Sequence, residues 1–256
     1  ADFENRRTSV KGKAKNVIAI IRGTDPKLKD TYVIASAHYD HLGMREGEGD
    51  QIFNGANDNA SGVAGLIEIC KVFAKSKPKR SVVFIAFYGE EKGLVGARYY
   101  GANPVFPLKD TVANINLEQI GRTDDSEGPR TAAFNLTGYD FTNLPSFLGS
   151  EATKEGVQLV KHEQFSDPYF NASDNAAFAV LGIPCGTISV AYQFPDYHKQ
   201  GDHWDKLNYP NMAMVVRAIA RGVYAVAESD SVVKWNETNP KVSRYVEAQK
   251  KLWGGS

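Results

Sequence analysis

The sequence lacks the features that mark several specialised classes of protein. It has two cysteines in 256 residues, so it is not a disulfide-rich scaffold. Lysine plus arginine and aspartate plus glutamate number 30 each, and this zero net charge predicts no surface for nucleic acid or an anionic membrane. No apolar run approaches the roughly 18 residues that cross a bilayer. With 42% hydrophobic residues, the chain is expected to bury a sizeable core without disulfides.

What is present is an alternation of strand and helix patterns. Short β-branched, apolar runs predict strands at residues 16–22, 32–37, 81–88, 111–117, 132–136 and 183–190, the first two as a hairpin-like pair. Apolar residues at helical spacing predict helices at residues 59–74, 94–100, 144–155, 174–181, 211–229 and 241–252. No linker or repeat interrupts this order. The prediction is a single α/β domain over residues 1–256, with a mixed, mostly parallel central sheet flanked by helices.

Metal-binding and acid–base side chains follow several of these strands. In open α/β sheets, sites form at the carboxyl edge, so these side chains are expected to converge there. They occur in five segments: SAHYDH at 36–41, NGANDNASG at 54–62, GEEKG at 89–93, NLEQIG at 116–121 and DYHKQGD at 196–202.

The five segments together supply the groups that a hydrolytic two-zinc site needs. Such a site requires a bridging carboxylate, imidazole or carboxylate ligands for each ion, and one carboxylate free to act as a base. Each segment alone has a structural explanation, such as a helix N-cap at Asp58 or a solvated helix start at Glu90 and Glu91. Their joint occurrence favours the metal site. The candidate residues are His38, Asp58, Glu90, Glu91, Glu118 and His198.

In these segments the chain resembles the zinc-dependent M28 aminopeptidases. The family's motifs are His-x-Asp, Gly-Ala-x-Asp-Asn-x-Ser-Gly, Gly-Glu-Glu-x-Gly-x-x-Gly, Asn-x-Asp-Met-x-Gly and Tyr-His. They match residues 38–40, 55–62, 89–96, 116–121 and 197–198, and the resemblance covers about residues 16–228. It implies the zinc exopeptidase fold, a three-layer sandwich, and a catalytic core over about 16–228. It also implies a metallo-exopeptidase that acts on peptides with a free N-terminus and is secreted or periplasmic, although this chain shows no targeting segment.

The resemblance also implies a role for each matching residue. His38 and Glu118 would bind one zinc ion, Glu91 and His198 the other, and Asp58 would bridge the two. The resemblance implies four further features: Glu90 as the general base for a zinc-bound hydroxide, Asp40 behind His38 to fix its tautomer, Tyr197 as an oxyanion donor or a packed side chain, and a cis peptide bond after Asp58.

Two positions depart from the family's pattern. The fourth motif commonly carries Asp where this chain has Glu118, and Gln119 stands where an apolar residue is usual. The extra methylene of Glu118 changes the reach of its carboxylate. This difference affects whether zinc fills both sites.

The remaining candidates receive mainly structural interpretations. His41 is predicted to be structural or on the surface, and His162 and His203 to be on the surface. Asp174 belongs to a Ser-Asp pair that lies near the site in the resembled family. Cys70 and Cys185 are predicted to be buried thiols without a chemical role.

Besides a carboxypeptidase or dipeptidase of the wider two-zinc fold, two other functions remain open from the sequence. One is a single-zinc glutaminyl cyclase on a similar fold, which the peptidase form of the Asp58–Gly62 segment disfavours. The other is a binding module that kept the fold but lost its metals, which the complete ligand set disfavours.

Overall fold

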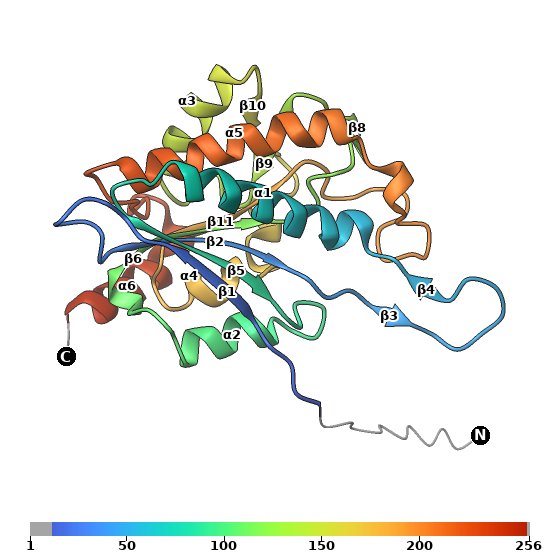
Figure 1. Cartoon of the computed structure of the whole chain (residues 1–256), viewed down its shortest axis with the longest axis horizontal. Coiled ribbons are helices and arrows are strands. Elements are labelled where there is room, and N and C mark those ends of the chain that lie inside the picture. The colour runs from blue at the N-terminus through green and yellow to red at the C-terminus, as the bar shows by residue number, and fades with distance from the viewer. Residues whose placement is uncertain (1–11, 255–256) are drawn as a thin grey trace.

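The computed structural model describes residues 12–254 and is built on a seven-stranded sheet (Figure 1). Its strand order is β1-β5-β2-β6-β11-β9-β10. Strands β5, β2, β6 and β11 run parallel, whereas β1 and β9 are antiparallel to β5 and β11 respectively. This mixed, mostly parallel sheet confirms the predicted fold class. The strands are β1 (Val17–Ile21), β2 (Tyr32–His38), β5 (Ser81–Phe87), β6 (Thr111–Leu117), β9 (Ala133–Leu136), β10 (Gln158–Val160) and β11 (Cys185–Ser189).

The predicted hairpin-like pairing of the first two strands is wrong. β5 lies between β1 and β2, pairing antiparallel with the first and parallel with the second. The short polar connection after Ile21 suggested a tight turn, but it carries the chain past the position that β5 fills later. Backbone groups on both edges of β5 are thereby paired, and β2 and β6 become neighbours in the middle of the sheet.

Alternate residues of the central strands bury their side chains on opposite faces. In β2, Val33 and Ala35 join one apolar cluster, while Ile34 joins the other. Helices α1, α3 and α5 cover the first face, and α2, α4 and α6 cover the second, as Figure 1 shows. The helices are α1 (Gly62–Lys75), α2 (Val95–Ala102), α3 (Leu144–Lys154), α4 (Asn175–Ala179), α5 (Tyr209–Glu228) and α6 (Ser243–Gly254).

The segment before α1 differs from the predicted helix, which was expected to begin at Asn59. It forms an irregular helical turn, η1 (Ala56–Ser61), in which Asp58 and Asn59 have non-helical backbone angles. The regular helix begins at Gly62. Asp58 is therefore presented by a buried turn between the sheet and α1, not by the helix itself.

Several short elements were not anticipated from the sequence. Strand β10 extends the sheet edge, and residues 123–130 contain a two-stranded hairpin. The short strands and turns are β3 (Gly43–Met44), β4 (Ile52–Phe53), β7 (Asp124–Asp125), β8 (Gly128–Pro129), η2 (Leu108–Asp110), η3 (Pro168–Asn171), η4 (Trp204–Lys206) and η5 (Pro240–Val242).

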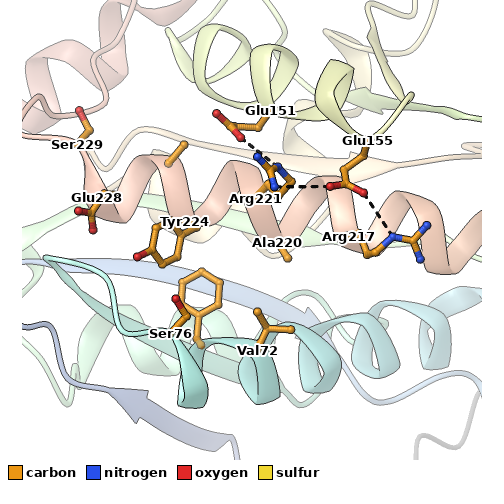
Figure 2. A pocket seen from close by; sticks show the side chains of 12 residues that line it. Val72, Ser76, Glu151, Glu155, Arg217, Ala220, Arg221, Tyr224, Glu228 and Ser229 are labelled. Carbon is orange, nitrogen blue, oxygen red and sulfur yellow. Dashed lines mark hydrogen bonds and ion pairs between the residues drawn. The ribbon is translucent and has the colours of Figure 1, made fainter.

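A groove of about 700 Å³ lies between α1 and α5, beside α3 (Figure 2). Val72 and Tyr224 contribute apolar surface, and Arg221 pairs with Glu151 at 3.2 Å and with Glu155 at 3.6 Å. Val72 lies ten residues along α1 from Gly62, about 15 Å at the usual rise per residue. This groove is therefore remote from the edge where the candidate residues gather.

Two further expectations concern the cysteines and the membrane. Both cysteines are free; Cys185 is buried as expected, whereas Cys70 is only partly buried. Within residues 12–254, no helix combines the length and the apolar character needed to cross a bilayer.

Candidate metal centre

Three adjacent parallel strands bring most of the candidate residues to one edge of the sheet. His38 is the last residue of β2, and Glu118 follows the last residue of β6. Glu90 and Glu91 come three and four residues after the end of β5. Because β5, β2 and β6 are parallel neighbours, their carboxyl ends meet at the same edge. The predicted convergence of these side chains is confirmed.

Asp58 lies at the middle of the cluster, with one histidine facing each oxygen of its carboxylate. The Nε2 atom of His38 is 3.3 Å from Oδ1, and the Nε2 atom of His198 is 3.2 Å from Oδ2. His198 Nε2 is also 3.4 Å from Oε2 of Glu91. Two ligands of one tetrahedral zinc ion lie about 3.3 Å apart, because zinc–nitrogen and zinc–oxygen bonds are roughly 2.0–2.2 Å long. All three separations fit that spacing.

Several polar atoms of this cluster are buried without a hydrogen-bond partner among residues 12–254. They include His38 Nε2, Asp58 Oδ1 and Glu118 Oε2. The ligating atoms of these three residues lie within 4.8 Å of one another. Buried polar atoms without partners are rare in folded proteins, and a cation shared by these three would satisfy all of them. The donor set therefore fits a metal ion on the His38 side of Asp58.

The cluster holds more acidic groups than its histidines can neutralise. Burial raises the pKa of Glu90 to about 9, and the negative charge of Glu118 adds to the effect. Burial also raises the pKa of Glu118 to about 7 and that of Asp174 to about 7. Burial opposes the charged form of His38, but its contact with Asp58 and the negative charges of Glu118 and Glu90 together outweigh burial and raise the pKa of His38 well above its ordinary value. Such an excess of carboxylates suits divalent cations.

Asp58 responds differently from the other carboxylates of the cluster. Burial acts to raise its pKa, but the contacts with His198 and His38 outweigh burial, and the pKa of Asp58 is lowered. Asp58 therefore keeps its negative charge and offers both oxygens to cations. This is the property that a bridging ligand requires.

The turn that carries Asp58 is held from two sides. The peptide bond between Asp58 and Asn59 is cis, as the resemblance implies. The side-chain amide of Asn59 donates to the backbone oxygen of Leu117 at 2.9 Å, and its oxygen accepts from the backbone N–H of Gly62 at 3.1 Å. Asn59 thereby ties the bridging turn to both the end of β6 and the start of α1.

The sequence analysis missed a role for Asp202, although its segment was singled out. Asp202 is fully buried, and its carboxylate accepts the backbone N–H groups of Asn57 and Asp58 at 3.0 Å. The side-chain oxygen of Asn57 in turn accepts from the backbone of Gly121 at 2.8 Å. The only sequence feature that pointed to Asp202 was its place as the second acidic residue of the segment at 196–202. Nothing in the sequence indicated that this carboxylate holds the Asp58 turn.

Asp40 contacts His38 in a different way from the one expected. The Nδ1 atom of His38 lies 3.1 Å from the backbone oxygen of Asp40 and 3.8 Å from its carboxylate. That carboxylate accepts instead from the backbone N–H groups of Gly89 at 2.8 Å and Glu90 at 3.1 Å. The backbone oxygen of Asp40 thus orients the imidazole, and its side chain orients the Glu90 segment.

Tyr197 packs beside the cluster and lines a small pocket. Its ring stacks on that of His198, with centroids 3.9 Å apart. The pocket has a volume of about 120 Å³ and opens next to Glu118. It is also lined by Gln119, Thr137, Tyr169, Ala172, Ser173, Thr187, Ser189 and Tyr192.

The remaining histidines have three different surroundings. His203 has 41% of its side chain exposed, as predicted. His162, predicted to be on the surface, is buried because its ring packs on Phe165 at 4.5 Å and on Tyr192 at 5.5 Å. His41, expected to be structural or on the surface, lies inside the cluster with Nδ1 2.8 Å from Oε1 of Glu91. Tyr192 is 30 residues from His162 and Glu91 is 50 residues from His41, so no local sequence pattern indicated these surroundings.

Asp174 is brought close to the cluster, as its motif suggested. It is fully buried, and both of its carboxylate oxygens are without a hydrogen-bond partner in the described part of the chain. The charges of His38 and Glu118 act on its pKa, which places it on the His38 side of the cluster.

Histidines and carboxylates surround a shared aspartate at the carboxyl edge of a mixed sheet. This arrangement is typical of metal-binding α/β proteins. The comparison with known families is more specific. Residues 16–223 match the model of Peptidase family M28, and the chain belongs to this family. The match coincides with the predicted range of the resemblance, about residues 16–228.

Three relatives show the breadth of this similarity. A probable zinc metalloprotease of Pyrenophora tritici-repentis is 26% identical over 203 residues, which cover 78% of this chain and 45% of that protein. The solved aminopeptidase from Aneurinibacillus sp. strain AM-1 has a TM-score of 0.66 and 27% identity, covering 85% of this chain and 49% of that chain. This chain therefore spans about half the length of these two relatives.

A glutaminyl cyclase shares the fold as well. The solved enzyme from Porphyromonas gingivalis has a TM-score of 0.60 at 18% identity, covering 81% of this chain and 76% of that chain. At this identity the likeness concerns the fold alone.

Proposed function

We propose that the chain is a zinc-dependent aminopeptidase that holds two zinc ions and hydrolyses the N-terminal peptide bond of peptides. The observation that carries this proposal is the arrangement around Asp58. Its two carboxylate oxygens face different histidines at 3.3 and 3.2 Å, the separations expected of ligands that share an ion. A carboxylate placed in this way would be able to hold two cations, one at each oxygen.

The ligand sets follow from this division. His38 and Glu118 would hold one ion with Oδ1 of Asp58, and Glu91 and His198 would hold the other with Oδ2. When bound, zinc polarises a carbonyl group and lowers the pKa of water, so that hydrolysis proceeds at neutral pH. The protein's part is to fix the ligands and to supply the acid–base groups.

Glu90 is the residue proposed to move the proton. Hydrogen bonds from the backbone of Gly89 and Glu90 to Asp40 fix its position, and the charges of Glu118 and Glu91 act on its carboxyl group. As general base, Glu90 takes a proton from the attacking water and gives it to the departing amine nitrogen. The hydroxyl of Tyr197 donates to the oxyanion that forms on the attacked carbonyl.

The surroundings favour a substrate with a free N-terminus. The pocket beside Glu118 has a volume of about 120 Å³, enough for one small or medium side chain but not for a longer stretch of peptide. The excess of carboxylates attracts a positively charged amine. Together these features support a site that binds one residue of the substrate with its free α-amino group.

The experiment compares free and blocked N-termini on the zinc-loaded protein. We expect about two zinc ions per chain by elemental analysis, hydrolysis of a panel of aminoacyl p-nitroanilides, and no hydrolysis of their N-acetylated counterparts. Cleavage of the acetylated substrates at a similar rate would exclude an aminopeptidase. Full zinc loading without cleavage of any substrate would favour a non-catalytic binding protein, which the complete ligand set argues against.

The glutaminyl cyclase is the second candidate, because the solved cyclase shares the fold. As a cyclase, this chain would act with one zinc ion and would release ammonia from an N-terminal glutamine without releasing an amino acid. Incubating a glutaminyl peptide with the protein distinguishes the two products. Ammonia release with a single bound zinc ion would establish the cyclase in place of the aminopeptidase.

Export from the cytoplasm also stays a proposal, based on the family resemblance. Fractionation of the source cells, with an antibody against this chain, would test it directly.

A further inference from the structure

His41 lies inside the candidate metal centre, with a ligating atom within 4.8 Å of those of Asp58 and Glu91, but it belongs to neither of the proposed ligand sets. Its side chain is 8% exposed, and its ring meets that of His198 edge-on at a centroid distance of 5.6 Å. On its other side lies the backbone of Gly55: a Cβ atom added there would stand 2.7 Å from Cγ of His41. The ring is therefore confined between the loop before Asp58 and the second ligand set.

The contact between His41 and Glu91 has the length of a hydrogen bond. Nδ1 of His41 is 2.8 Å from Oε1 of Glu91 and 3.8 Å from Oδ2 of Asp58. The distances between proposed co-ligands, from 3.2 to 3.4 Å, are longer. Since a carboxylate only accepts, the hydrogen of this bond is carried by Nδ1. The two oxygens of Glu91 thus have different partners, His41 on Oε1 and His198 on Oε2.

We infer that His41 is a positioning residue that holds Oε1 of Glu91 through its Nδ1–H group, so that Oε2 is directed at the ion shared with His198. This inference rests on the proposed two-zinc site. Groups that orient metal ligands in this way raise metal affinity, and their loss typically weakens binding by about 10–100-fold. His41 would act on the Glu91 ion, because it has no contact of this kind with Glu118 in the part of the chain that the structure describes.

Three variants separate the hydrogen bond from the bulk of the ring. His41→Leu removes the donor and keeps an apolar side chain in the space. His41→Asn keeps an N–H donor close to the position of Nδ1 but cannot replace an imidazole ligand. His203→Leu is the matched control, because His203 is a partly exposed histidine outside both ligand sets.

The measurement is the affinity for each of the two zinc ions, by competition with a chromophoric chelator, together with the melting temperature of the zinc-free protein. We expect His41→Leu to lower the affinity for one zinc ion by about 10–100-fold and to leave the affinity for the other near the wild-type value. His41→Asn should recover most of that loss, and His203→Leu should behave as wild type. The zinc-free melting temperatures report whether each variant folds, and His41→Met replaces His41→Leu if the latter does not.

Two outcomes would overturn the inference. Unchanged affinity for both ions in His41→Leu would show that Glu91 needs no such support. Equal losses in His41→Asn and His41→Leu would show that the imidazole acts as a ligand and not as a donor. If the wild-type protein binds a single ion, the two-zinc proposal fails, and the same comparison on that ion still decides the role of His41. If the wild-type protein does not bind zinc, both the two-zinc proposal and the inference about His41 fail.

Discussion

Glu90 and Glu91 are neighbours in the chain, but their side chains have different surroundings. Glu91 lies between two histidines, with Oε1 2.8 Å from His41 and Oε2 3.4 Å from His198. Burial and the nearby carboxylates raise the pKa of Glu90 to about 9, so it holds a proton more readily than Glu118 or Asp174, whose pKa values are about 7. In the proposed site, Glu91 would therefore bind metal and its neighbour Glu90 would move the proton.

This difference predicts distinct effects of two matched substitutions. Glu90→Gln should lower kcat by about 10²–10⁴-fold, because the amide cannot accept a proton, while the zinc content stays at the wild-type level. Glu91→Gln should lower the zinc content, because it removes the charge of a ligand. Steady-state kinetics and elemental analysis on both variants check this. A parallel loss of zinc in the two variants would contradict the assignment of roles.

At the residue scale, the sequence predicted the members of the cluster but not their supports. His38, Asp58 and Glu118 could be predicted because each stands at the end of an apolar strand or in a motif. Asp202 and His41 act through contacts with residues 144 and 50 positions away, which no local pattern encodes. His162 was misplaced for a similar reason, since its burial depends on Tyr192, 30 residues along the chain.

At the scale of elements, the turn η1 depends on Asp202. This carboxylate accepts backbone N–H groups from Asn57 and Asp58 in a fully buried position. Asp202→Asn replaces one acceptor oxygen by a donor that faces those N–H groups. We expect a loss of roughly 1.5–3 kcal/mol in the free energy of unfolding, the range for hydrogen bonds to charged groups, together with weaker zinc binding.

Chemical denaturation of the zinc-free protein and chelator competition measure these two effects. Asp205→Asn is the control, because Asp205 is an exposed residue of the nearby turn η4. If Asp202→Asn matched this control in both measurements, Asp202 would have no role in holding the turn.

The start of α1 makes a second prediction at this scale. Gly62 lies so close to β6 that an added Cβ would stand 2.5 Å from the backbone oxygen of Leu117 and 2.3 Å from Oδ1 of Asn59. Gly62→Ala should therefore destabilise the protein by about 1–3 kcal/mol, as overpacking does. A Cβ added at Gly149, inside α3, would come no closer than 3.7 Å to any other part of the chain within residues 12–254, and Gly149→Ala should instead stabilise by about 0.5–1 kcal/mol.

Thermal or chemical unfolding of the two variants compares them directly. Opposite signs are expected, because both glycines are helical, but an added Cβ would clash with its surroundings only at Gly62 and would make ordinary contact at Gly149. A Gly62→Ala protein as stable as Gly149→Ala would show that α1 can move away from β6 at little cost.

The elements themselves were largely predictable, whereas their arrangement was less so. Apolar periodicity located the central strands and the long helix α5 to within a few residues. It did not reveal that β5 inserts between β1 and β2, because strand order depends on which later strand completes the pairing. The true start of α1 was also missed, since the contacts of Asn59 with Leu117 and Gly62 draw the turn out of helical geometry.

At the scale of the whole molecule, the buried acidic cluster makes stability depend on both pH and metal. Folding raises the pKa of Glu90 to about 9 and those of Glu118 and Asp174 to about 7, mainly through burial. A carboxyl group with a raised pKa contributes stability that is fully present below its unfolded pKa and is lost as the pH rises through the folded pKa. The pKa values of His38 and His198 are raised as well, so their contributions change in the same direction.

The lowered pKa of Asp58 does not offset this trend. A carboxyl group with a lowered pKa contributes stability that is present above its unfolded pKa and lost only in stronger acid. Asp58 is therefore ionised throughout the range in which Glu118, Asp174 and then Glu90 lose their protons. From weakly acidic to alkaline pH, the metal-free protein gains uncompensated negative charge at one buried edge of its sheet.

The metal-free protein should therefore melt at progressively lower temperature between about pH 5 and pH 9, where these groups lose their protons. Zinc should raise the melting temperature more at about pH 8 than at pH 5. At the higher pH the ligands are deprotonated and bind zinc, and the positive charge of the ion offsets the negative charge of the carboxylates. Differential scanning calorimetry with chelated and zinc-loaded samples measures both trends. The double variant Glu90→Gln/Glu118→Gln, which removes two of the titrating groups, should show a flatter profile without metal. A metal-free melting temperature that stays constant or rises across this range would mean that the cluster tolerates its own charge without a cation, and the electrostatic argument for metal at this edge would fail.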